Sequence, residues 1–222
     1  MQGIVPVLKP KGPTSHDIVA AVRRVVGARK VGHAGTLDPL ASGVLVIGVG
    51  NATKQLNNEM LKEKEYEADI TLGATSTTDD AEGQLTQSAV LQRPSREEIE
   101  QLLPHFIGNI QQFPPTFSAV KVGGVPAYAH ARKGRTVTLG ARSVEIISIA
   151  ILLYEWPILR VRVITGPGVY IRSLARDIGE RLACGGYISE LVRTRVGEFH
   201  IAHAVSPSDV PEYLAAEADG GA

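Results

Sequence analysis

Several stretches of the chain alternate apolar and polar positions with a period of two, which is typical of half-buried strands. The clearest is KEYEADITLG, residues 64–73, where every second side chain from Tyr66 to Leu72 is apolar. GIVPVLK at residues 3–9 and the continuous apolar run VLVIGVG at 44–50 also predict strands. SVEIISIAILLYEW and ILRVRVITG predict neighbouring antiparallel strands on either side of Trp156-Pro157.

A period of 3.6 marks three helices, each with local start or stop signals. SHDIVAAVRRVVG places Ile18, Val22 and either Val25 or Val26 on one stripe, with Thr14 or Ser15 as N-cap and Gly27 as stop. SREEIEQLLPHF starts at Ser95 with Glu98 at capping-box spacing. VYIRSLARDIGERLACGG predicts a helix whose inward side chains are Ile171, Leu174, Ile178 and Leu182.

Helices and strands are interspersed without a regular βαβ rhythm, so we expect an α+β fold around a mixed, largely antiparallel sheet flanked by helices and functional loops. ATSTTDDAEG, residues 74–83, has the composition of a loop, and Gly123-Gly124 predicts a turn that leads into a short helix. The last dozen residues, rich in acids and small side chains, are expected to be frayed.

Composition changes this picture little. A chain of 222 residues can bury a proper core without a metal or disulfide. Cys184 is the only cysteine, which excludes an internal disulfide and fits a reducing compartment. The N-terminal stretch has no secretory pattern, and no apolar run approaches 18 residues. We therefore expect a cytoplasmic protein that does not enter membranes.

The net charge is zero, yet the charges are unevenly distributed. No acid occurs from Gln101 to Val144, and acids gather instead between Glu59 and Glu100 and after residue 208. A polarised chain of this kind can present a positive face to a polyanion, although solvated faces of mixed sign are the commoner outcome. The basic residues of the acid-free stretch are Lys121, Arg132, Lys133, Arg135 and Arg142.

The stretch GHAGTLDPLASGVL, residues 32–45, holds one acid, Asp38, among small residues. Asp38 as N-cap, Pro39 at the first helical position and Gly43 as stop would make an ordinary helical turn. A functional loop is the alternative, because Pro39 restricts Asp38 to extended backbone and glycines permit close approach of another segment. Residues alone leave both alternatives open. GVGNAT, residues 48–53, lacks the third glycine of a dinucleotide loop.

GHAGTLDPLASGVLVIGVGNATK resembles the catalytic segment of the TruB-type tRNA pseudouridine synthases. Five further blocks agree in order and spacing and extend the resemblance from about Val7 to Phe199: LKPKGPTSHD, KEYEADITLG, FSAVKVGG, GVYIRSLARDIGERL and SELVRTRVGEF. The resemblance implies the pseudouridine synthase fold and isomerisation of the T-loop uridine at tRNA position 55. Such an isomerisation needs neither metal nor organic cofactor.

The resemblance also assigns roles to single residues. It makes Asp38 the nucleophile, Arg172 its guanidinium partner, and Tyr66 the residue that packs on the target base and helps remove its C5 proton. Without the resemblance, Tyr66 would be assigned to the core, Arg172 to an exposed helix face and His33 to solvent. The remaining matched positions are Tyr170 and Leu191 around the flipped uridine, His33 that fills the vacated stack, Asp80 in the arginine network, and Lys9, Pro10 and Lys121 at structural or RNA-facing positions.

The chain departs from the family pattern at Leu8 and Thr77, where the family often has Asp. We expect a catalytic domain over residues 1–205 and a short acidic tail over 206–222, without the C-terminal RNA-binding domain of the PUA type that bacterial members usually carry. The expected partner is the tRNA T stem-loop, bound by a monomer. Two alternatives stay open: an RNA-binding module or tRNA folding chaperone without chemistry, and a synthase for another RNA guided within a complex.

Overall fold

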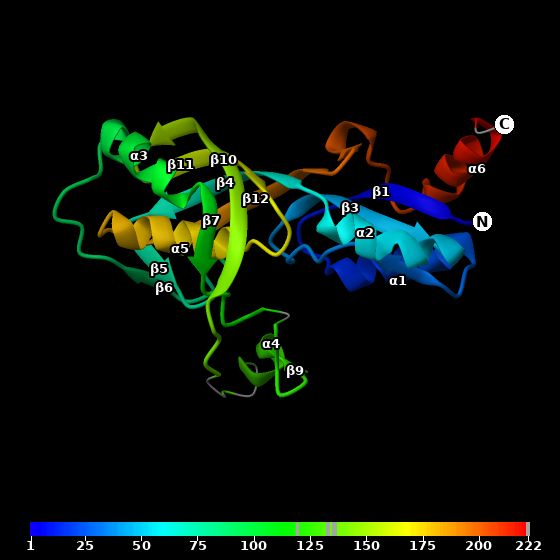
Figure 1. The fold of residues 1–222 in the computed structure, drawn as a ribbon, viewed down its shortest axis with the longest axis horizontal. Coiled ribbons are helices and arrows are strands. Elements are labelled where there is room, and N and C mark those ends of the chain that lie inside the picture. The colour runs from blue at the N-terminus through cyan, green and yellow to red at the C-terminus, as the bar shows by residue number, and fades with distance from the viewer. Residues whose placement is uncertain (119, 132–133, 135–136, 221–222) are drawn as a thin grey trace. The chain divides into compact units, whose positions relative to one another are not determined.

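A computed structural model gives the fold and describes residues 1–118, 120–131, 134 and 137–220. The chain divides into two compact units, which Figure 1 lets the reader follow by colour. Unit 1 comprises Met1–Glu67 and Leu191–Ala222, and unit 2 comprises Ala68–Glu190. Two strands, β4 (Lys64–Leu72) and β12 (Gly186–Val196), carry residues of both units. Unit 2 is therefore an insertion between two segments of unit 1.

Unit 1 contains antiparallel pairs of β3 with β1 and β2, while β12 runs parallel to β3 and antiparallel to β13. Together with the antiparallel pairs of unit 2, this confirms the expected α+β class and mixed, largely antiparallel pairing. Besides the two shared strands, the elements of unit 1 are β1 (Gly3–Lys9), α1 (Ser15–Val26), β2 (Val31–His33), β3 (Ser42–Val49), η1 (Gly50–Gln55), α2 (Leu56–Leu61), β13 (Phe199–His200), η3 (Ile201–His203) and α6 (Val210–Gly220).

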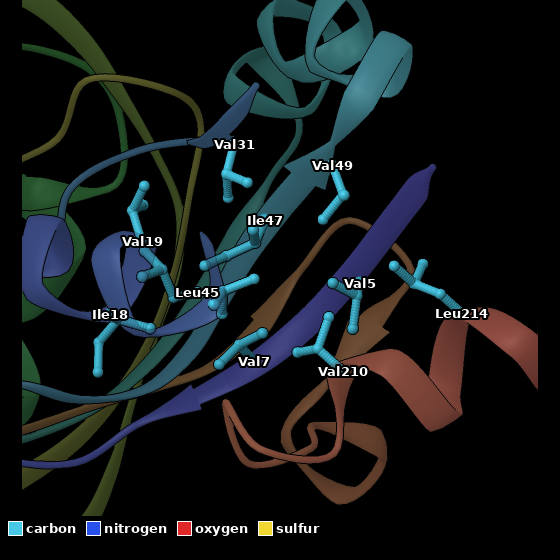
Figure 2. Close-up of a cluster of buried hydrophobic side chains, with 11 residues drawn as sticks. Val5, Val7, Ile18, Val19, Val31, Leu45, Ile47, Val49, Val210 and Leu214 are labelled. Carbon is cyan, nitrogen blue, oxygen red and sulfur yellow. The ribbon is translucent and has the colours of Figure 1, made fainter. Parts of the chain in front are cut away.

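The core of unit 1 lies where β1, β2 and β3 meet the helices α1 and α6 (Figure 2). Each strand and helix contributes apolar side chains that are almost completely buried, so burial of apolar area holds these elements together. The cluster consists of Val5, Val7, Ile18, Val19, Val22, Val31, Leu45, Ile47, Val49, Val210 and Leu214.

Helix α1 follows its sequence signals closely. Thr14 is the N-cap and forms a reciprocal capping box with Asp17, and Gly27 ends the helix with a left-handed φ of 62°. Ile18 and Val22 of the predicted stripe are buried, whereas Val25 is 45% exposed. Val26 packs against the core instead, which decides between the two alternatives for the end of the stripe.

Unit 2 is built on neighbouring strands in the order β12, β4, β11, β10 and β7. The long strands β10 and β11 pair antiparallel on either side of Trp156-Pro157, as predicted. The remaining elements of this unit are β5 (Ala74–Ser76), β6 (Leu85–Gln87), α3 (Arg96–Leu102), η2 (Leu103–Phe106), β7 (Gly108–Gln112), β8 (Lys121–Val122), β9 (Val125–Pro126), α4 (Ala127–Ala131), β10 (Arg142–Glu155), β11 (Ile158–Thr165) and α5 (Ile171–Arg181).

Helix α5 buries the stripe Ile171, Leu174 and Ile178, as expected, while Leu182 forms its half-buried C-cap. The segment that follows α5 can approach the helix closely only because residue 179 is glycine. A Cβ at Gly179 would lie 2.2 Å from the backbone of Gly185. The helix is thereby held against the segment that leads into β12.

Two expectations about local structure were wrong. Of the last dozen residues, those that the structure describes, 211–220, belong to helix α6 and not to a frayed tail, because Val210 and Leu214 are buried in the unit 1 core. The loop-like stretch 74–83 begins with the short strand β5, which pairs with β6. The domain boundary after residue 205 stays a prediction.

No helix among the described residues is long and apolar enough to span a membrane. The same part of the chain contains no group of three or more His, Cys, Asp or Glu side chains arranged to hold a metal ion.

Candidate active site

Asp38 lies in the segment between β2 and β3, which is a loop and contains no helical turn of the kind that an N-cap would begin. The carbonyl oxygen of Asp38 accepts a hydrogen bond from the Ala41 N–H at 3.1 Å, so residues 38–41 form a tight turn. Pro39 occupies the second position of this turn, where its fixed φ is favourable. The N-cap interpretation is therefore wrong, and the half-buried Asp38 side chain belongs to a loop.

Two buried side chains from the N-terminal segment anchor the backbone of this loop. The Ser15 hydroxyl both donates to the Leu37 carbonyl and accepts from the Leu37 N–H, each at 2.9 Å. The Lys9 ammonium donates to the carbonyls of Pro39 at 3.4 Å and Ala41 at 2.7 Å. These bonds fix the peptide group immediately before Asp38 and the carbonyls of two residues that follow it, Pro39 and Ala41.

A third anchor comes from the second sequence segment of unit 1, where Arg193 lies on β12. The guanidinium of Arg193 donates to the carbonyls of Gly35 at 3.1 Å, Thr36 at 3.4 Å and Val44 at 2.8 Å. Gly43 lets the two strands approach, since a Cβ there would lie 2.2 Å from the Arg193 carbonyl oxygen. Sequence analysis gave Arg193 no role.

Three other predicted site residues lie in the same unit as Asp38. His33 is half-buried at the end of β2, five residues before Asp38, and its ring meets that of His16 edge-on at 5.5 Å. Tyr66 on β4 and Leu191 on β12 are buried, on strands that are neighbours in the sheet. The expectation of a solvent-facing His33 is thus excluded.

Burial lowers the pKa of His33, and the positive charges of His16 and Arg193 lower it further. Because the folded-state pKa lies below the ordinary value of about 6.5, the unfolded chain binds the proton more tightly, so His33 costs stability as pH falls below that value. We expect His33→Gln to lose less unfolding free energy than the wild type between pH 7 and pH 5, measured by urea unfolding. The matched change at the exposed His105 controls for the removal of an imidazole from the chain.

Arg172 is buried in the first turn of α5, 5% exposed, so the expectation of an exposed helical arginine is excluded. Its guanidinium donates to the carbonyls of Thr78 at 3.0 Å and Phe117 at 2.9 Å, and lies 3.4 Å from the Asp80 carboxylate. Asp80, 2% exposed, also accepts from the Glu82 N–H at 3.1 Å. These contacts join Arg172 and Asp80 as the resemblance implies, within unit 2.

A second arginine, Arg176, repeats this arrangement one helical turn later. It pairs with Asp79 at 2.9 Å and donates to the Phe113 carbonyl at 3.0 Å. Asp79 adopts a left-handed φ of 60°, a conformation that costs about 1 kcal/mol or more outside glycine. The two consecutive acids are thus held by two arginines on the same face of α5.

Tyr170 is the N-cap residue of α5 and is half-buried. The buried side-chain amide of Gln112 holds it on both backbone groups, accepting from the Tyr170 N–H at 2.9 Å and donating to its carbonyl at 3.1 Å. Lys121 is exposed at the start of the short β8–β9 hairpin. Arg132, Lys133 and Arg135 of the acid-free stretch lie outside the described residues.

The predicted site residues therefore form two groups. Asp38, His33, Tyr66 and Leu191 belong to unit 1, whereas Asp80, Lys121, Tyr170 and Arg172 belong to unit 2. The pairing of Asp38 with Arg172 stays a prediction. Sequence analysis missed Arg193 and Gln112, although the spacing of Arg193 from Leu191 along a strand would have placed both on one buried face.

Family models match the chain almost from end to end. The model described as the TruB family pseudouridylate synthase N-terminal domain matches residues 23–171. The chain belongs to the TruB family. The model of the tRNA pseudouridylate synthase B C-terminal domain matches residues 172–221. A TruB-family chain is a pseudouridine synthase, and hence an isomerase, as expected.

Curated relatives agree with this TruB assignment. The tRNA pseudouridine synthase B of Thermobifida fusca is 47% identical over 217 residues, covering 92% of this chain and 72% of the relative. That of Mycobacterium tuberculosis H37Rv is 45% identical over 214 residues, covering 95% and 72%.

Solved structures share the fold of this chain. A chain in the crystal structure of a Cbf5-Nop10-Gar1 complex is 31% identical, with a TM-score of 0.71. A chain in an H/ACA RNP bound to a substrate RNA containing 2'-deoxyuridine is 28% identical, with a TM-score of 0.70. Each match covers 99% of this chain but only 56% of the solved chain, so this chain spans about half of their length.

Proposed function

We propose that this protein isomerises the T-loop uridine at position 55 of tRNA to pseudouridine, with Asp38 as the nucleophile. Its 45–47% identical relatives are named tRNA pseudouridine synthase B, which supports tRNA as the RNA in which pseudouridine is formed. The observation that carries the catalytic part is the half-buried Asp38 in a loop whose peptide groups are held by buried side chains. A carboxylate held in a fixed position suits nucleophilic catalysis, because it can form a covalent bond to the substrate and leave again as a stable anion.

The reaction breaks the N1–C1′ bond and rejoins the base through C5. Asp38 attacks C1′ of the sugar or C6 of the base and leaves again when the C5–C1′ bond has formed. Tyr66 packs on the base and helps remove the C5 proton, while N1 ends protonated, so the atoms balance without a redox partner. Arg172 is the proposed counter-charge of Asp38, and Tyr170 and Leu191 enclose the extruded uridine.

Extrusion of the base costs a few kcal/mol, and His33 is proposed to fill the vacated stack and offset part of that cost. Asp80 holds Arg172, and the exposed Lys121 contacts RNA phosphate. We propose that the folded shape of the T stem-loop is the main recognition element. We further propose a cytoplasmic monomer that uses no cofactor.

Pseudouridine mapping tests the substrate. The pure protein is incubated with a T stem-loop hairpin and with a hairpin of scrambled loop sequence, and carbodiimide adducts locate the product. We expect conversion of the single T-loop uridine in the first RNA and none in the second.

Two results would contradict the proposal in different ways. Binding without turnover on either hairpin would favour an RNA-binding module or chaperone. Modification that requires an added guide RNA would favour a guided synthase.

A further inference from the structure

Arg193 is an unusual residue to find inside unit 1. It is the largest of the fully buried side chains, 2% exposed, and its three hydrogen-bond acceptors are all backbone carbonyls. Burial of a charged group is costly even when its N–H donors are all hydrogen-bonded. A guanidinium in this position therefore calls for an explanation other than stability alone. Apolar side chains of similar total volume would fill the same interior without the cost of burying a charge.

The acceptors of Arg193 identify that role. Gly35 and Thr36 belong to the loop that carries Asp38, and Val44 is the third residue of the strand after it, so one planar group joins both ends of the loop. A guanidinium can do this because its donors diverge in a fixed plane, whereas an ammonium offers a single point. The backbone of Gly43 packs directly on that of Arg193, and this contact fixes the position of the Arg193 backbone relative to the loop.

The positive charge of Arg193 also affects titratable groups to which it is not hydrogen-bonded. It contributes to the lowered pKa of His33, and after burial it is the main cause that lowers the pKa of Lys64 to about 8. A charge that disfavours nearby cations favours a nearby anion.

We propose that Arg193 is a positioning residue of the synthase, which holds the loop so that Asp38 meets the nucleotide in reactive geometry. This inference rests on the proposed function and deepens it by adding a group that does not touch the substrate. Misplacement of a reacting group by about 1 Å costs on the order of 10²-fold in rate. We therefore expect Arg193→Lys to lower the single-turnover rate about 10²-fold with unchanged KM.

The test compares Arg193→Lys and Arg193→Gln with Arg195→Gln. Arg195 is a matched control because it lies on the same strand and donates to the Gly197 carbonyl, away from the loop. Hydrogen exchange is read at the amides of Leu37 and Ala41, which donate to Ser15 and Asp38. We expect faster exchange at both in the Arg193 variants only, together with the lower rate. Arg193→Lys retains the charge, which keeps the test valid if Arg193→Gln does not fold.

Unchanged exchange and rate in Arg193→Lys would overturn the inference. The inference would also be overturned if the Arg193 variants lose rate only in proportion to their loss of unfolding free energy, and if Arg195→Gln loses as much rate for an equal loss of unfolding free energy. Exchange needs no substrate, so its outcome is independent of the proposed function. That function fails separately if Asp38→Asn remains active.

Discussion

Asp38→Asn is expected to lower pseudouridine formation by more than roughly 10⁴-fold, since removal of a covalent nucleophile costs that much or more. Asn has the shape of Asp but lacks the anionic oxygen that attacks the nucleotide. The turn around it depends on the backbone carbonyl of residue 38 and on Pro39, which the substitution leaves in place. The measurement is tritium release from tRNA labelled at C5 of uridine, under single-turnover conditions.

A matched change at Asp209 serves as the control. Asp209 is exposed and precedes α6, where its carboxylate accepts from the Ser208 hydroxyl. Asp209→Asn is expected to release tritium at the wild-type rate. If Asp38→Asn also does so, Asp38 is not the nucleophile and the mechanism above is excluded.

Arg172→Met is expected to lower the free energy of unfolding by about 3–5 kcal/mol, because loss of one partner leaves the other charge buried and uncompensated. That charge is the Asp80 carboxylate, which is 2% exposed. Two carbonyls, those of Thr78 and Phe117, lose their donors in the same variant. Urea unfolding at pH 7 measures the loss.

The neighbouring pair gives an internal comparison. The side chain of Arg176 is 23% exposed and that of Asp79 14%, so Arg176→Met is expected to cost less, about 1 kcal/mol. Adding Asp80→Asn to Arg172→Met should recover part of the stability, since neither charge of this pair then remains buried. Equal costs for Arg172→Met and Arg176→Met would show that burial of Asp80 is not the cause.

Local signals predict a large part of this fold. Helix α1 is predicted correctly because its capping box, apolar stripe and terminal glycine all lie within the segment itself. Strand β4 is predicted equally well, since its alternation matches the observed burial at every second residue. In these cases local preference and tertiary packing agree.

Long-range contacts account for the failures. Helix α6 consists largely of small and acidic residues, and its place depends on burial of Val210 and Leu214 against strands near the N-terminus. Asp38 shows a related difficulty. Asp-Pro followed by glycine satisfies local rules for a helix start, so the residues alone left two alternatives open, while the actual loop is set by Lys9, Ser15 and Arg193. A single sequence gives no account of which distant side chain reaches a given carbonyl.

The insertion of unit 2 into unit 1 has a consequence for synthesis on the ribosome. Ser15 and Lys9 precede their partners in the loop by 22 to 32 positions, but Arg193 follows Gly35 by 158. A growing chain therefore contains Asp38 long before it contains the last anchor of that loop. Unfinished or prematurely terminated chains should be catalytically silent, even when their first strands and helix have already folded.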